Sequence, residues 1–103
     1  MNSFTTIEKY AIVKVLSHIM KADGIIHPKE EEFMNQIYSN FAITISELEN
    51  ITSIDDIQAN HIVRSMTNKK KDQAMSLFVG MAQTDSFIHP KEIEIINQFL
   101  QEK

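Results

Sequence analysis

The sequence predicts an all-α protein, a bundle of five to six short helices built from two related helix-turn-helix halves. A stretch that begins at Asp23 returns in close copy 62 residues later, at Asp85, and nine of the sixteen positions compared are identical. Apolar residues recur at helical spacing along most of the chain, and only two glycines and two prolines interrupt its 103 residues. We therefore expect a single domain, 1–103, with half-repeats at about 5–39 and 69–102.

The first helix is predicted over about 5–21. Thr5 with Glu8 three residues later is a capping-box pattern, in which each side chain accepts a hydrogen bond from the backbone N–H of the other residue. The expected inward face is a set of apolar residues at helical spacing: Ile12, Val15, Leu16, Ile19 and Met20.

The repeated stretch closes this helix and opens the next one. Gly24 follows Asp23 at a tight turn, where glycine adopts a positive φ at little cost and aspartate can bond its own backbone. Pro28 suits a first helical position, so the second helix is expected from Pro28 to about Ser39. Glu30 then lies near the third position, where a carboxylate can cap backbone N–H groups. The expected inward residues are Phe33, Met34, Ile37 and Tyr38.

The next stretch, 40–52, leaves two alternatives open. Three apolar residues alternate as in a strand, although a lone strand would have no partner in this chain. Ser46 with Glu49 would instead cap a short helix. The alternating residues are Phe41, Ile43 and Ile45.

The fourth helix is predicted to open at Ser53, which is followed by Asp56, and to run to about Thr67. Its expected apolar face comprises Ile54, Ile57, Ile62, Val63 and Met66. His61 on this helix and His18 on the first helix have no partner at metal-ligand spacing, so we expect both to be partly buried structural residues.

The second half begins at the lysine run, 68–71, which we interpret as a solvated joint. A fifth helix is expected to follow as far as about Thr84, and the last helix to run from Pro90 to the C-terminus. Apolar type is shared with the first half at Val15/Leu77, Leu16/Phe78 and Ile19/Met81. The inward residues expected in the last two helices are Ala74, Leu77, Phe78, Met81, Ile93, Ile96, Phe99 and Leu100.

Composition excludes several kinds of function. The chain has no cysteine, which rules out disulfides, thiolate metal sites and cysteine nucleophiles. A formal charge of −4 argues against a nucleic-acid partner, which would need a basic patch. No apolar run reaches the roughly 18 residues of a membrane span, and the first residues carry neither a basic nor a hydrophobic leader. We expect a soluble, cytoplasmic protein without a membrane span.

The duplicated turn resembles that of the tellurite-resistance protein TerB family and of the N-terminal domain of the DnaJ-like co-chaperone DjlA. The residues that carry this resemblance are Ala22, Asp23, Gly24, Ile26 and Glu30, echoed by Asp85, Ile88 and Glu92. The resemblance spans essentially the whole chain and implies an all-helical fold, acidic turn residues that bind metal ions, and roles in tellurite resistance, stress or phage defence. The chain departs from the pattern at Ser86, and it carries no J-domain or anchor that would support a co-chaperone role.

The candidate metal ligands are the repeated acids and histidines. An EF-hand calcium site is disfavoured, because Lys21 and Ile19 stand where two oxygen ligands would be needed. A site assembled between the halves would instead be rich in oxygen and suited to calcium, magnesium or manganese, with the imidazoles shifting the preference towards zinc or nickel. The proposed ligands are Asp23, Glu30, Asp85, Glu92, His27 and His89.

Helix capping competes with metal binding as the role of these residues. We favour capping, because both glutamates suit the third position of a helix. The leading functional hypothesis is a small module that binds a partner protein, a second copy of itself or a divalent ion. The alternatives are a metal-dependent hydrolase, for which no activated nucleophile can be named, and a purely structural interaction domain.

Overall fold

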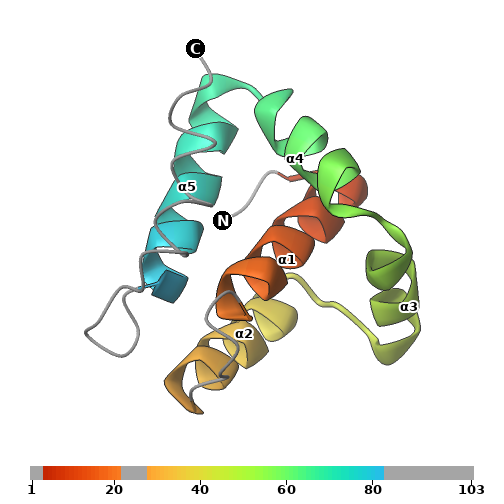
Figure 1. Ribbon diagram of the computed structural model, residues 1–103, viewed down its shortest axis with the longest axis vertical. Helices are drawn as coiled ribbons and strands as arrows, with labels where there is room; N and C mark the ends of the chain where they lie inside the picture. The colour runs from red at the N-terminus through yellow and green to blue at the C-terminus, as the bar shows by residue number, and fades with distance from the viewer. Residues whose placement is uncertain (1–3, 22–27, 83–103) are drawn as a thin grey trace.

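The computed structural model describes residues 4–21 and 28–82, which contain five α-helices and no strand (Figure 1). The predicted all-α class is thereby confirmed. The helices expected at 90–103 and the second copy of the turn lie outside the described residues. The described helices are α1 (Thr6–Met20), α2 (Pro28–Asn40), α3 (Ile45–Ser53), α4 (Asp56–Arg64) and α5 (Asn68–Ala82).

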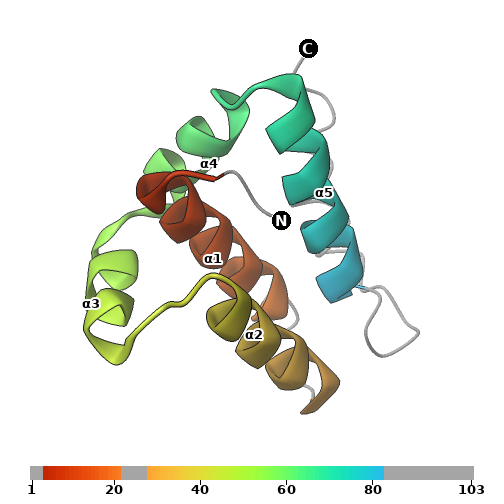
Figure 2. The same cartoon turned by 180° about the vertical axis from the view of Figure 1, so that it is seen from behind.

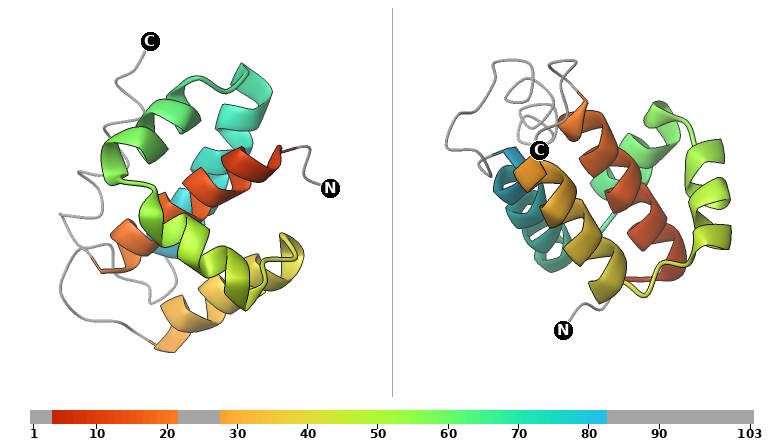
Figure 3. Two further views of the ribbon diagram at one scale, coloured as in Figure 1. Left: turned by 90° about the vertical axis from the view of Figure 1, so that its right-hand side faces the viewer. Right: turned by 90° about the horizontal axis from the view of Figure 1, so that it is seen from below.

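Helix α1 is the central element, and it contacts each of the other four described helices. Its most extensive contact is with α4, and Figures 1 and 2 show it between α5 on one side and α3 on the other. The two views of Figure 3 show α2 running alongside α1 at the end of the molecule away from α4. This central position explains why α1 buries six apolar residues rather than a single narrow stripe: Ala11, Ile12, Val13, Val15, Leu16 and Ile19.

Two helices begin with complete capping boxes. The predicted box at Thr5 and Glu8 is present, and a second one lies at Thr44 and Glu47, where it opens α3. The helical alternative for 40–52 was therefore right, but its start at Ser46 was wrong by two residues. In the Thr44 box the Glu47 N–H donates to the Thr44 hydroxyl and the Thr44 N–H donates to the Glu47 carboxylate, and this pair of bonds fixes where α3 begins.

The alternation around Phe41 belongs to a helix end and not to a strand. Ala42 has a φ of 56°, the Ile43 N–H donates to the Tyr38 carbonyl at 2.9 Å, and the Ala42 N–H donates to the Ser39 carbonyl at 3.1 Å. This is a Schellman motif, which turns the chain sharply after α2. The turn buries Phe41, whose ring meets Phe4 edge-on at a centroid distance of 6.0 Å.

The predicted bounds and apolar face of α4 need correction. Asp55, and not Ser53, caps the helix by accepting from the Gln58 N–H at 2.7 Å, and the helix ends at Arg64 instead of near Thr67. Ile57, expected inside, is 80% exposed. The buried residues of α4 are Ala59 and Val63, which lie four residues apart on one side of the helix, and Met66 is buried just beyond the helix end.

Helices α1 and α5 occupy equivalent places in the repeat. Both are 15 residues long, and their first and last residues differ by 62 positions, the offset of the duplicated motif. Equivalent core positions are fully buried in both helices, with Leu16 matching Phe78 and Ile19 matching Met81.

The lysine run is not a joint, because residues 68–71 form the first turn of α5. The connection from α4 lies at 65–67, and lysine is a good helix former in its own right. Thr67 precedes the helix, and its Oγ1 accepts from the Lys70 N–H at 3.4 Å. The Lys70 ammonium is not free in solvent either, because it lies 2.9 Å from the Glu8 carboxylate of α1.

Candidate functional site

Glu30 is the one predicted metal ligand that lies within the described residues. The other five, Asp23, His27, Asp85, His89 and Glu92, are outside them. Glu30 sits in the first turn of α2, as expected from Pro28 at the helix start, and its side chain is 2% exposed. It takes part in a polar interaction, as a buried carboxylate must in order to offset the loss of hydration.

Burial separates Glu30 from Glu8 and Glu47, the glutamates of the two capping boxes found within residues 4–21 and 28–82. Glu8 and Glu47 stand at the third position of their helices and are half-buried. Each carboxylate accepts a hydrogen bond from the backbone N–H of the threonine that caps the helix. The residue before α2 is His27, and histidine is not among the preferred cap residues. Glu30 therefore differs in setting from the glutamates whose capping role is plain.

The described residues do not assemble a metal site on their own. Across 4–21 and 28–82, no three histidine, aspartate or glutamate side chains come close enough together to hold an ion. Any cation held by Glu30 would need further ligands from outside the described residues or from water.

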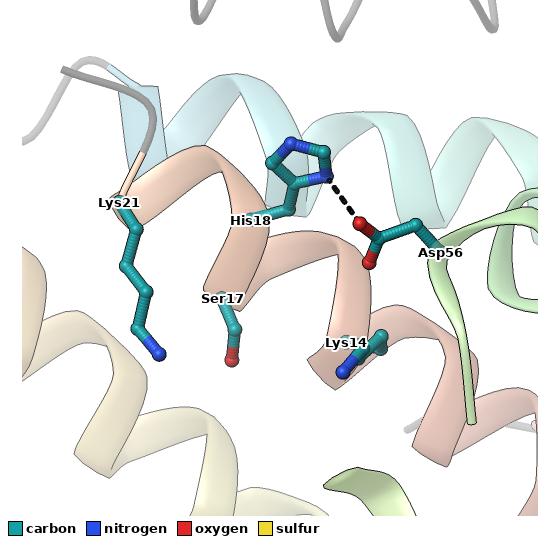
Figure 4. Close-up of a pocket in the computed structure, with 5 residues that line it drawn as sticks. All are labelled: Lys14, Ser17, His18, Lys21 and Asp56. Atoms are coloured by element: carbon teal, nitrogen blue, oxygen red, sulfur yellow. Dashed lines mark ion pairs between the residues drawn. The ribbon is translucent and has the colours of Figure 1, made fainter. Parts of the chain in front are cut away.

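A polar pocket of about 200 Å³ lies between α1 and the start of α4 (Figure 4). Four of its residues come from one side of α1, where they are three, four and seven positions apart, and Asp56 comes from the first position of α4. The lining residues are Lys14, Ser17, His18, Lys21 and Asp56.

Two weak contacts shape this pocket. The His18 Nδ1 atom lies 3.5 Å from the Asp56 Oδ2 atom, with about half of each side chain exposed. The Lys14 Nζ atom lies 3.5 Å from the backbone oxygen of Thr52 in α3, which is a long donor distance. Both contacts bind α1 to neighbouring helices near the pocket.

The pocket lacks the arrangement of a hydrolytic triad. Ser17 and His18 are adjacent on α1, so their side chains point in different directions, and Figure 4 shows the Ser17 hydroxyl directed away from the imidazole. Among the described residues of this pocket, no base lies beside the hydroxyl to activate Ser17 as a nucleophile.

Both histidines of the described helices are more exposed than predicted. His18 and His61 are solvent-exposed rather than partly buried, because each lies on the side of its helix away from the core residues. The spacing of Lys14, Ser17, His18 and Lys21 is a signal that sequence reasoning missed, since it places four polar side chains together on one side of a helix. The approach of Asp56 depends on tertiary packing and carries no such signal.

A second, smaller pocket of about 160 Å³ lies between the end of α1 and α2. Burial raises the pKa of Tyr38 in its wall. Its other lining residues are Met20, Glu31, Met34 and Asn35. The predicted use of methionines as core filler agrees with the full burial of Met34.

Comparison of the chain with known protein families, with characterised proteins and with solved structures gave no match. Within residues 4–21 and 28–82, no helix has both the length and the apolar character needed to cross a membrane.

Proposed function

We propose that this protein is a TerB-like binding module whose duplicated turns hold a divalent cation, with Glu30 as a ligand. The observation that carries the proposal is the burial of Glu30, a carboxylate that is 2% exposed at the start of α2. A buried carboxylate is held by polar partners or by a metal ion, and on this proposal the cation is a partner of Glu30 in addition to the polar interaction that it already makes.

The chemistry of the repeat supports an oxygen-rich site. Asp23 and Glu30, together with Asp85 and Glu92, would supply oxygen ligands suited to calcium, magnesium or manganese. The imidazoles of His27 and His89 would favour zinc. On this proposal, ion occupancy alters the surface that a partner protein or a second copy of the chain recognises.

A binding role is favoured over hydrolysis. Among the described residues, the one serine next to a histidine and near an aspartate lies in the α1–α4 pocket, and its hydroxyl points away from the imidazole. The resemblance to TerB makes tellurite exposure and other stresses, acting in the cytoplasm, the cellular conditions in which to look for a phenotype.

Thermal unfolding with and without divalent ions tests the proposal. Protein stripped with a chelator is melted against calcium, magnesium, manganese and zinc, each over a range of concentrations. Binding to the folded state raises the midpoint progressively with free ion, by mass action. We expect a saturable rise with one of these ions and its loss in the Glu30→Gln variant.

Glu31→Gln is the matched control, because Glu31 is the next residue of α2 and is exposed. Each variant is read by its ion-dependent rise rather than by its midpoint without ion, so destabilisation by the substitution itself does not confuse the result. A rise of equal size in Glu30→Gln and Glu31→Gln, or no rise with any ion, would contradict the proposal. It would leave a module whose repeated acids only cap helices and close turns.

A further inference from the structure

We propose that the pocket between α1 and α4 binds a phosphate group, carried by inorganic phosphate or by a small phosphate monoester. The donors assigned to it are the Lys14 and Lys21 ammonium groups and the Ser17 hydroxyl. None of the residues that line the pocket belongs to the duplicated motif, and the proposal neither requires nor excludes a cation at that motif.

Donor capacity is the first observation behind this proposal. Within the described residues, the Ser17 hydroxyl and the Lys21 ammonium make no hydrogen bond or ion pair, and Lys14 spends one of its three protons on the distant Thr52 oxygen. Ser65 and Ser76 each donate to the carbonyl four residues earlier, whereas Ser17 makes no such bond. The Ser17 hydroxyl is therefore available to a ligand.

The directions of the donors are the second observation. Lys14, Ser17 and Lys21 are three and four positions apart along α1, so they form one row on its surface. Figure 4 shows the Ser17 hydroxyl between the two lysine side chains, with the His18 imidazole turned away from all three. Three donors in a row can reach different oxygens of one ligand group.

Charge and size narrow the ligand class. Among the described lining residues, two lysines against Asp56 leave one positive charge in excess, on a chain whose formal charge is −4. The Asp56 Oδ2 atom lies 3.5 Å from the His18 Nδ1 atom. Lysines bind phosphate as point charges, whereas a planar carboxylate is best held by the two-pronged guanidinium of arginine, which this pocket lacks. A volume of about 200 Å³ admits a phosphate group with its water shell.

An NMR titration at neutral pH and constant ionic strength tests the proposal. Inorganic phosphate, phenyl phosphate and acetate are added in separate series to chelator-treated protein, and backbone amide shifts are followed. We expect saturable shifts with phosphate, confined to the amides of residues 14–21 and 56, and much weaker binding of acetate. Tighter binding of phenyl phosphate than of inorganic phosphate would identify an ester as the natural ligand, whereas the reverse order would identify the free ion.

Three variants test whether phosphate binds in this pocket. Lys21→Gln should weaken phosphate binding by about threefold to tenfold, because it removes a charged donor. Asp56→Asn should strengthen binding, because it removes the opposing charge. Lys69→Gln is the matched control, an exposed lysine on α5 outside the pocket, and should leave affinity unchanged.

The proposal is overturned if phosphate produces no saturable shift at residues 14–21. It is also overturned if Lys21→Gln and Lys69→Gln weaken binding equally, which would indicate general attraction to surface charge. Circular dichroism of each variant establishes that the helices are retained. Because the protein is free of divalent ions throughout, failure here leaves the cation proposal untouched.

Discussion

The starts of α1 and α5 are the same place in the two halves of the repeat, yet they are held in different ways. Thr5 and Thr67 stand 62 residues apart, and each hydroxyl oxygen accepts from the N–H three residues on. In α1 that third residue is Glu8. Its carboxylate accepts a hydrogen bond from the Thr5 N–H at 2.8 Å, which completes a capping box. In α5 it is Lys70, which has no acceptor to offer.

Lys70 instead forms an ion pair with a residue of another helix, Glu8 of α1. Its ammonium lies 2.9 Å from the Glu8 carboxylate, with the two side chains 22% and 16% exposed. One carboxylate thus accepts both the local bond that begins α1 and the long-range bond that joins the two helix starts. The difference teaches that divergence between repeat copies can exchange a local contact for a tertiary one without changing where either helix begins.

The largest expected effect comes from core substitutions, which test whether α1 and α5 contribute equally to the free energy of unfolding. Leu16 and Phe78 are equivalent and both fully buried, so Leu16→Ala and Phe78→Ala should each lower the free energy of unfolding by about 3–5 kcal/mol. Leu77→Ala serves as the control, because Leu77 is only half-buried and should cost less. Urea denaturation measures all three. A loss below about 1 kcal/mol at either buried position would show that the halves do not share their core equally.

Exchanging the charges of Glu8 and Lys70 tests whether their ion pair stabilises the fold. Glu8→Lys alone should cost about 1–2 kcal/mol, since it breaks the capping box and sets two ammonium groups together. Lys70→Glu alone should also destabilise, because it opposes two carboxylates. The double exchange restores an ion pair and offers Thr67 a glutamate partner, so most of the loss should return.

A double-mutant cycle on urea midpoints measures this recovery. Additive losses in the double variant would show that the Glu8–Lys70 contact contributes nothing to stability.

Removal of the threonine caps gives a smaller effect that should differ between the halves. Thr5→Ala breaks a complete box and should lower the free energy of unfolding by about 1 kcal/mol. Thr67→Ala removes one long bond of 3.4 Å and should cost only about 0.5 kcal/mol. The same urea series compares them, with Thr6→Ala as an exposed control on α1. Equal losses at both caps would contradict the difference drawn above.

Lowering the pH should weaken the start of α1, which depends on the Glu8 carboxylate, more than the start of α5. Partial burial pulls the pKa of Glu8 upward, but the hydrogen bonds from Thr5 and Lys70 outweigh it, and the pKa lies below its usual value of 4.5. The unfolded chain therefore takes up this proton first, so the stability contributed by Glu8 is present above about pH 4.5 and is lost as pH falls through the lowered value.

Glu8→Gln isolates that contribution, because glutamine can still complete a capping box but carries no charge. The gap in melting midpoint between the chain and this variant should be widest near neutral pH and should close in acid. A gap of the same size from about pH 7 to about pH 3 would show that the Glu8 charge is irrelevant to stability.

Local signals in the sequence were sufficient to predict several helix starts. The Thr5–Glu8 box and Pro28 placed α1 and α2 to within a residue, because caps and proline act over one turn of backbone. The same kind of signal failed at Ser46 and Ser53, where neighbouring residues offered competing caps and Thr44 and Asp55 were used. Ala42 was missed because the turn after α2 places an alanine where glycine is the usual marker.

Tertiary contacts account for most of what the sequence did not reveal. Ile57 fitted an apolar periodicity and yet is exposed, since nothing in the sequence says which side of α4 meets α1. The burial of Glu30 and the approach of Asp56 to His18 likewise depend on how helices pack. Of the predicted metal ligands, Glu30 lies within the described residues, and the metal-binding role of all six residues stays a prediction.

The ion pair between Glu8 and Lys70 has a consequence for symmetry. It joins a residue to its own repeat equivalent, 62 positions away. In a homodimer of identical single-copy chains, a contact of this kind would bring the same residue type from each subunit together, and a charged residue would face its own charge. Opposite charges at such a position require the two copies to differ in sequence, as the two copies within this polypeptide do.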